Sequence, residues 1–162
     1  MKRVVLFIFL IVMIQSGCSN HSNPLEIGEA SPPFTIMKSG SDGRDVPYGL
    51  RGVEGKLAIV DAPVREGADN KQLLHLWGDS AEKTEQLFDR PVTVVGTSQE
   101  GKTITAFEGV VGFPNEDIIK PPHFYAESVG YLTLPSTGTW KLDAYIDEVW
   151  FGSIVVEVQP GE

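Results

Sequence analysis

Few residues in the chain have the type and spacing that catalysis or metal binding requires. Cys18 is the only cysteine, and the histidines are His21, His75 and His123. The sequence contains no G-x-S-x-G nucleophile elbow and no glycine-rich phosphate loop, and nothing marks a partner for His75 as a base. The histidines form no H-x-H or H-x-x-x-H pair of the kind that metal sites use. We therefore expect no catalytic residue, no metal site and no cofactor.

The thiol of Cys18 has a different chemistry available because of the residues that precede it. Lys2 and Arg3 are followed by the apolar run 4–14, and QSGC then brings small residues directly before the thiol. The apolar run has the length of a signal-peptide core and is shorter than the roughly 20 residues that cross a membrane. QSGC resembles a lipobox, although Gln15 stands where leucine is usual. We expect residues 1–17 to be a lipoprotein signal peptide and Cys18 to carry the lipid.

An ordinary secretory signal with a cysteine by chance is the alternative interpretation of this segment. Exported proteins use cysteines in pairs for disulfides, so a lone exposed thiol is unusual in them.

The formal net charge of −9 limits the partners that the chain can bind. An acidic domain is repelled by phosphate backbones and anionic head groups. We expect no nucleic-acid partner, and membrane attachment through the lipid on Cys18 alone.

The remaining chain has the composition of a single β-rich domain. Glycine and proline are frequent, 17 and 11 residues, and punctuate short apolar stretches. Strands are predicted at 34–38, 57–61, 72–77, 92–97, 103–108, 128–134, 139–146 and 151–158. Residues 39–55 and 64–70 are predicted as loop and turn, and Ser80 is expected to cap a short helix over 80–88. About seven or eight strands with one short helix indicate an all-β, immunoglobulin-like β-sandwich over 34–162, preceded by a flexible spacer over 18–33.

The residue pattern of the segment 132–145 is typical of the strand, corner and strand that include strands E and F of immunoglobulin domains. GTWKL matches the spacing of the G-x-Y-x-C segment, with Trp140 and Leu142 in the inward positions. Ile154 must also face the core, because polar residues alternate with the apolar ones of its strand. A plain two-residue turn would leave Ile154 exposed. We predict that Leu142 lies opposite Ile154, through a three-residue connection at 147–149 or a bulge near Gly152.

Four segments resemble those of a known group of proteins. LLHLWGD, PVTVVGTSQEGK, LPSTGTWKLDAYID and FGSIVVEV are similar to parts of an uncharacterised family of small, Bacillus-type lipoproteins from Gram-positive bacteria, over roughly residues 57–158. The chain departs from that pattern at 147–148, where Asp-Gly would be expected. The resemblance implies an immunoglobulin-like fold and a lipid anchor, and it implies no known activity.

Aromatic residues are the remaining candidates for contact with a ligand. In KPPHFYAES, which is predicted as loop, His123, Phe124 and Tyr125 form a candidate binding loop, although the aromatic rings could instead plug the end of the sandwich. Trp77, Trp140 and Trp150 are candidates for a carbohydrate platform, although Trp77 and Trp140 are expected to pack in the core. His75 is expected to be an ordinary strand residue whose ring is partly buried and hydrogen-bonded.

The leading functional hypothesis is a non-enzymatic, lipid-anchored protein at the outer face of the cell membrane. It would bind a protein or a cell-envelope component through loops at one end of the sandwich. Two alternatives remain open. One is a small-molecule or metal-binding lipoprotein that serves a transporter, and the other is an exported inhibitor of a hydrolase.

Overall fold

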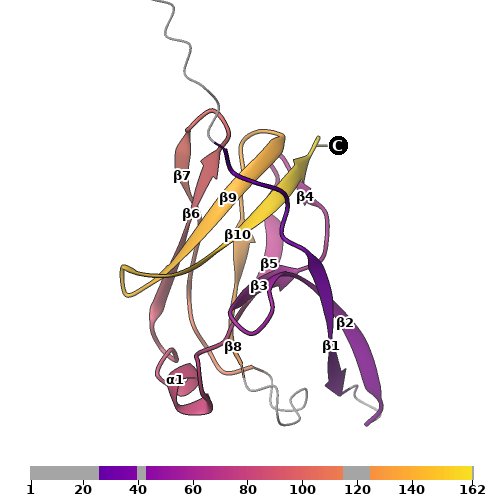
Figure 1. Cartoon of the computed structure of the whole chain (residues 1–162), viewed down its shortest axis with the longest axis vertical. Helices are drawn as coiled ribbons and strands as arrows, with labels where there is room; N and C mark the ends of the chain where they lie inside the picture. The colour runs from indigo at the N-terminus through magenta and orange to yellow at the C-terminus, as the bar shows by residue number, and fades with distance from the viewer. Residues whose placement is uncertain (1–25, 40–42, 115–124, 162) are drawn as a thin grey trace, which may run out of the picture.

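A computed structural model describes residues 26–39, 43–114 and 125–161, which form two sheets (Figure 1). The first sheet has the strand order β1 (Pro33–Ser39), β2 (Asp45–Val53), β3 (Leu57–Val60), β5 (Asn70–Leu76), β8 (Ala126–Leu132). The second has the order β4 (Val64–Arg65), β10 (Val149–Gln159), β9 (Gly138–Ile146), β6 (Pro91–Ser98), β7 (Thr103–Val110). With one short helix, α1 (Ala81–Glu85), this arrangement confirms the predicted all-β sandwich.

The main core lies between the two sheets and includes the alternating residues predicted from the sequence. Trp140, Leu142 and Ala144 of β9 are all buried, with Trp140 fully enclosed. The indole Nε1 of Trp140 donates a hydrogen bond of 3.0 Å to the carbonyl of Ser136, which fixes the corner that leads into β9. Large apolar side chains on one face of each strand therefore join the sheets without a disulfide.

The β9–β10 hairpin has the register that the hydrophobic pattern predicts. Leu142 lies opposite Ile154, and the register shifts at a bulge between Trp150 and Gly152. The alternative of a three-residue connection is wrong, because Ile146 pairs with Val149 across a two-residue turn. The bulge supplies the odd offset that keeps both apolar sets in the core.

Strand β2 occupies a segment that the sequence predicts as loop. Its glycines and charges hide a strand that is stabilised by pairing with β1 and β3 rather than by a strong apolar pattern of its own. Leu50 is nevertheless fully buried. Gly52 is required by packing, because a Cβ there would lie 2.3 Å from the carbonyl oxygen of Leu57. The predicted turn over 64–70 likewise contains the short strand β4, in which Val64 is buried.

The β1–β2 hairpin forms one edge of the first sheet, and its side chains pack over outward-facing residues of β5 and β8 in the same sheet. Leu74 and Leu76 of β5 point into the main core, whereas Trp77, just after β5, belongs to a second cluster. The buried residues of that cluster come from several elements; they are Ile36, Leu50, Ala58, Trp77 and Tyr125. We call this cluster the second core.

The segment before β1 is attached to the sandwich. The Ser31 N–H donates to the carbonyl of Val155 at 2.9 Å, and the Val155 N–H donates to Ser31 Oγ at 2.9 Å. Ser31, predicted as part of a flexible spacer, thus covers the open edge of β10 at this point.

Helix α1 begins as the sequence predicts but is shorter than expected. Ser80 is its N-cap, and its Oγ accepts a hydrogen bond of 3.2 Å from the Lys83 N–H. The helix ends at Glu85, rather than continuing to residue 88. Within the described part of the chain, no helix has the length and apolar character needed to cross a membrane.

Candidate functional site

Of the sequence-predicted site residues, only Tyr125 falls among those that the structure describes. Cys18, His123 and Phe124 lie outside the described residues. Tyr125 is only 2% exposed, and its ring centroid lies 5.0 Å from that of His75 and 5.6 Å from that of Trp77. Tyr125 therefore packs in the second core, which is one of the two alternatives expected for it, and the candidate binding loop itself stays a prediction because His123 and Phe124 lie outside the described residues.

Next to Tyr125, three titratable side chains meet from three different strands. Lys38 Nζ of β1 lies 3.2 Å from Glu127 Oε1 of β8 and 3.3 Å from His75 Nε2 of β5. His75 Nδ1 lies 3.2 Å from the carbonyl of Leu73, which can only accept. That contact assigns the ring proton to Nδ1, so that Nε2 accepts from Lys38. We call Lys38, His75 and Glu127 the charged cluster.

Burial and mutual contact shift the pKa values in the charged cluster. Burial is the main cause that lowers the pKa of His75 below its ordinary value of 6.5. Burial alone would raise the pKa of Glu127, but the neighbouring His75 ring and the ammonium of Lys38, which lies 3.2 Å from Glu127 Oε1, bring it below 4.5. Burial and the nearby Glu127 carboxylate also raise the pKa of Tyr125.

The charged cluster has the groups for acid–base chemistry, but these groups are largely enclosed by the described residues around them. The ring of His75 is fully buried, and the side chains of Lys38 and Glu127 are 8% and 13% exposed. Lys38 Nζ also lies 3.9 Å from the centroid of the Tyr48 ring, which covers it from β2. These contacts hold the β1–β2 hairpin against β5 and β8, which is a structural role. His75 is thus more deeply buried than the sequence suggested, and it is hydrogen-bonded as expected.

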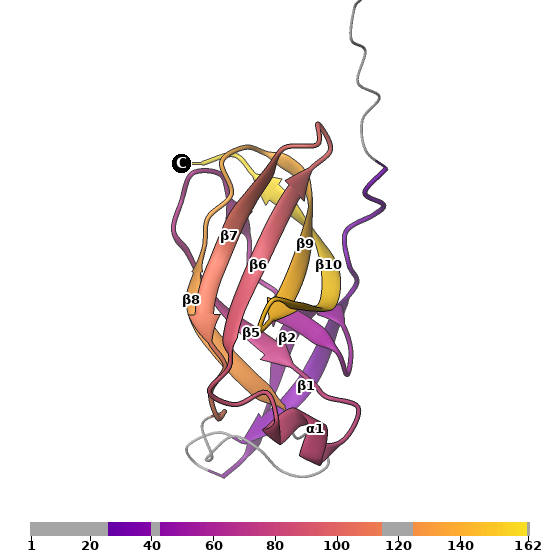
Figure 2. The same ribbon diagram turned by 90° about the vertical axis from the view of Figure 1, so that its left-hand side faces the viewer.

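An open groove lies elsewhere, between α1 and the tip of the β9–β10 hairpin. Its volume is about 450 Å³. Its lining comes from the β2–β3 turn, the segment from residue 78 through α1 to residue 90, and the hairpin; the residues are Lys56, Gly78, Asp79, Lys83, Gln86, Leu87, Arg90, Ile146, Asp147, Val149, Trp150 and Phe151. Figure 2 shows α1 close to this hairpin, near the end of the sandwich that lies away from the β6–β7 turn.

Local packing explains why these elements converge. The Trp77 N–H donates to the carbonyl of Lys56 at 3.0 Å, which ties the β2–β3 turn to the start of the α1 connection. The Gly78 N–H donates to Thr84 Oγ1 at 2.9 Å, and a Cβ at Gly78 would lie 2.5 Å from the Thr84 nitrogen. Glycine at this position therefore lets α1 pack tightly against the segment that forms one wall of the groove.

The groove exposes aromatic and apolar surface on the hairpin side. Trp150 is 58% exposed and Val149 is 69% exposed. The indole Nε1 of Trp150 lies 3.3 Å from Ser153 Oγ and 3.4 Å from Asp143 Oδ1, so the exposed ring is held in orientation. Trp150 thus differs from Trp77 and Trp140, which are buried as the sequence predicts.

The charges that line the groove are only partly paired. Arg90 Nη1 donates to Asp147 Oδ2 at 2.6 Å. Lys83 Nζ donates to the neutral Gln86 at 3.2 Å, and Lys56 Nζ lies 4.2 Å from the centroid of the Phe151 ring. Among the described residues, neither lysine forms an ion pair with a carboxylate. The groove can therefore accept an aromatic or apolar contact together with a negative charge.

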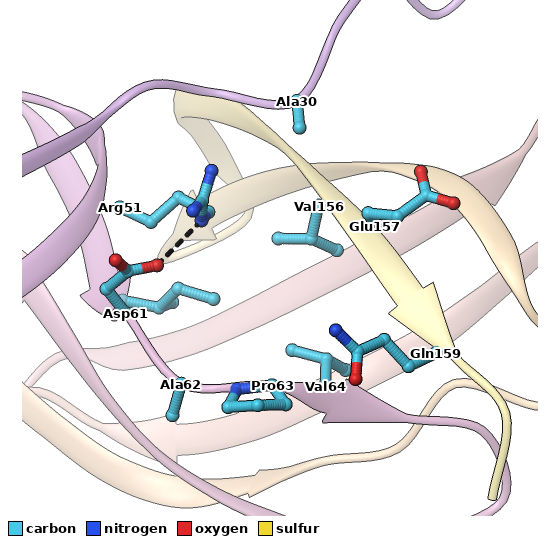
Figure 3. A pocket seen from close by; sticks show the side chains of 10 residues that line it. Ala30, Arg51, Asp61, Ala62, Pro63, Val64, Val156, Glu157 and Gln159 are labelled. Carbon is cyan, nitrogen blue, oxygen red and sulfur yellow. Dashed lines mark hydrogen bonds and ion pairs between the residues drawn. The ribbon is translucent and has the colours of Figure 1, made fainter.

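A second cavity, of about 260 Å³, lies where the chain crosses from β3 in the first sheet to β4 in the second. Figure 3 shows Arg51 and Asp61 pointing toward one another on one side, with Val156 and Gln159 of β10 opposite. Arg51 Nε donates to Asp61 Oδ1 at 2.9 Å, and Arg51 Nη1 donates to the carbonyl of Ser31 at 2.8 Å. Its principal cation is thus already engaged in holding the N-terminal segment on the sandwich.

The described residues bring together no group of three or more His, Cys, Asp or Glu side chains that could hold a metal ion. Among the groove residues, the sequence pointed to Trp150 only as one of three tryptophans considered for a carbohydrate platform, and it did not point to Lys56 or Lys83. The signal for Trp150 was its position between the predicted turn and the predicted bulge at Gly152, where strict alternation stops. The two lysines carried no comparable signal, because only the packing of α1 and the β2–β3 turn brings them to the hairpin.

Comparison with known proteins gives a family and a distant structural neighbour. A family model described as "Domain of unknown function (DUF4871)" matches residues 28–156. A search of curated proteins finds no match. A structure titled "X-ray Crystal Structure of a Putative Lipoprotein from Bacillus anthracis" is similar at 16% sequence identity and a TM-score of 0.48, covering 81% of this chain and 86% of the other.

Proposed function

The chain belongs to the DUF4871 family of domains of unknown function, and we propose that it is a lipid-anchored, extracytoplasmic binding protein. The lipid is carried by Cys18, at the outer face of the cell membrane, and the groove beside α1 binds a component of the cell envelope. QSGC after a short apolar run supports the anchor. The observation that carries the binding role is the open groove with Trp150 exposed on its wall.

The strand arrangement supports an immunoglobulin-like sandwich. In that fold, strands B and E are neighbours in one sheet, and strands C, F and G lie in the other. Here β5 pairs with β8, and β9 pairs with both β6 and β10. The hydrogen bond from Trp140 to the Ser136 carbonyl takes the place of the tyrosine corner that precedes strand F in immunoglobulin domains.

This correspondence supports the proposed binding role of the groove. The connection from β5 to β6, which contains α1, corresponds to the B–C loop, and the β9–β10 turn corresponds to the F–G loop. Both loops contribute to the binding end of immunoglobulin variable domains. The groove therefore has the location that loop-based recognition uses on this architecture.

The groove is also well placed for a tethered protein. In Figures 1 and 2, the described N-terminal stretch enters at the end of the sandwich opposite α1. An anchor on Cys18 would thus leave the groove facing away from the membrane, toward the rest of the envelope.

The anchor is tested by replacing the lipidated thiol. Cys18→Ala should abolish incorporation of a radiolabelled fatty acid and leave an unprocessed precursor, because no other thiol is present. Equal labelling of the variant and the parent protein would contradict the proposed lipidation.

The binding role is tested with isolated Gram-positive cell walls and the full chain in detergent. Trp150→Ala should lose most of the co-sedimentation with the walls. The matched control is Tyr131→Ala, because Tyr131 is also an exposed aromatic residue, at 61%, but lies on the outer face of β8 away from the groove. Retention of full binding by Trp150→Ala would exclude the groove as the binding site.

A further inference from the structure

We propose that the ligand of the groove is a carbohydrate that carries an anionic group, with a sugar ring stacked on Trp150 and the anion beside Lys56 and Lys83. The inference rests on the proposed binding role of the groove and adds the chemical class of the ligand.

The aromatic part of the argument comes from Trp150. Most of its indole is exposed, while Nε1 is held by Ser153 and Asp143. A flat ring already fixed in orientation loses little conformational freedom when a ligand binds. The electron-rich face of an indole suits the polarised C–H groups on the apolar face of a sugar ring. Trp150 thus offers the platform that the buried Trp77 and Trp140 cannot provide.

The electrostatic part of the argument comes from the two lysines. Lys56 and Lys83 have no carboxylate partner among the described residues, and Asp147 is already engaged by Arg90. Asp79 is the one further carboxylate on the lining. The chain as a whole carries a net charge of −9 and repels anions at long range. Two unpaired lysines against a single carboxylate therefore make the groove a local exception, where a carboxylate or phosphate gains contacts.

The size of the groove fits a small ligand or a short stretch of polymer. A volume of about 450 Å³ falls in the ordinary range for sites that hold small molecules. Because the groove is open rather than enclosed, it can bind internal units of a chain as well as a free end. An anionic glycan satisfies the aromatic, charge and size requirements together.

The test uses the full chain in detergent and four probes: tetragalacturonate, its methyl ester, glucose 6-phosphate and inorganic phosphate. Trp77 and Trp140 are buried, so iodide-quenchable fluorescence reports Trp150. Tetragalacturonate should protect this fluorescence, and the neutral methyl ester should bind at least about tenfold more weakly. Glucose 6-phosphate should compete more strongly than inorganic phosphate, because it adds a sugar ring to the charge. The two charged sugars together distinguish carboxylate from phosphate as the preferred anion.

Variants separate the ligand class from the proposed binding role. Lys56→Ala with Lys83→Ala should weaken tetragalacturonate binding about tenfold or more, whereas Lys102→Ala, an exposed lysine in the β6–β7 turn, should have no effect. Equal binding of the ester and the acid, or full affinity of the double variant, would overturn the anionic class. If no sugar binds while Trp150→Ala still abolishes wall binding, the ligand class is wrong and the binding role stands. If no sugar binds and Trp150→Ala keeps full wall binding, both the ligand class and the binding role of the groove are wrong.

Discussion

Two regions of this protein place a lysine beside an aromatic ring, with opposite consequences. In the charged cluster, Lys38 Nζ lies 3.9 Å from the centroid of the Tyr48 ring and contacts both His75 and Glu127. In the groove, Lys56 Nζ lies 4.2 Å from the centroid of the Phe151 ring and has no carboxylate partner among the described residues. The first lysine is buried and satisfied within the fold, and the second is available to a ligand.

The comparison shows that a shifted pKa does not by itself mark a functional site. The pKa values of His75 and Glu127 are shifted because burial and neighbouring charges act on them inside a packed hairpin interface. The groove is a candidate binding site for a different reason, because its lining residues are exposed and its lysines have no carboxylate partner among the described residues. In this molecule, the solvent exposure of side chains, rather than a shifted pKa, distinguishes the candidate binding site from the structural charged cluster.

The largest expected effect is on stability, when the charged cluster loses its carboxylate. Glu127→Gln leaves the buried ammonium of Lys38 without a counter-ion and should lower the free energy of unfolding by about 3–5 kcal/mol. The double variant Lys38→Met with Glu127→Leu should recover most of that loss, since it removes both charges. Urea denaturation measures both. A loss below about 1 kcal/mol in Glu127→Gln would mean that the cluster is open to solvent like the groove.

Acid should destabilise the charged cluster in two steps. The folded state holds His75 neutral, so the unfolded chain binds its proton more readily, and stability falls as the pH drops below 6.5. Each group contributes at most about 1.4 kcal/mol per pH unit. A second loss begins near pH 4.5, because the folded state also lowers the pKa of Glu127. Stability of His75→Gln, measured by denaturation across this range, should lose the first step only; an unchanged slope below pH 6.5 would show that His75 is not its source.

A smaller effect, and a gain, is expected at the turn that borders the groove. Asp147 and Glu148 have φ angles of 49° and 65°, in the left-handed region that favours glycine. Glu148→Gly should stabilise the protein by about 1 kcal/mol in thermal unfolding. Asp147→Gly should gain less, because it also removes the ion pair with Arg90. Destabilisation by Glu148→Gly would mean that the glutamate side chain makes a stabilising contribution in this turn.

The smallest effect on stability is expected for the residue with the largest expected effect on binding. Trp150→Ala should change the free energy of unfolding by about 0.5 kcal/mol or less, because its ring is mostly exposed. Trp140→Ala, in the main core, should cost about 3–5 kcal/mol by the same urea titration. A large loss for Trp150→Ala would show that the groove wall is part of the packed structure.

Several features of the structure could be predicted from short, local sequence patterns. The alternation along 140–146 and the need to keep Ile154 inside predicted both the bulge and the pairing of Leu142 with Ile154. Ser80 predicted the start of α1 because an N-cap acts within one turn. The all-β sandwich and the family followed from short apolar strands and from segment resemblance. Each of these signals is contained within a few neighbouring residues.

Other features depended on contacts between distant parts of the chain. Strand β2 was missed because its stability comes from pairing with β1 and β3. The two alternatives left open for Tyr125 were decided for this residue by the hairpin that covers it. Neither the charged cluster nor the groove could be predicted, since Lys38, His75 and Glu127 come from three strands and the groove residues from three connections.

The sequence by itself determined the class of fold and the strand register at the C-terminal hairpin, because hydrophobic periodicity and turn chemistry act locally. It also predicts that Cys18 carries a lipid, because a processing motif is likewise contained in a few neighbouring residues. Only the tertiary structure decided which aromatic and charged side chains are enclosed and which face solvent. The physical reason is that burial is a property of what packs on top of a residue, and the β1–β2 hairpin covers His75 while nothing described covers Trp150.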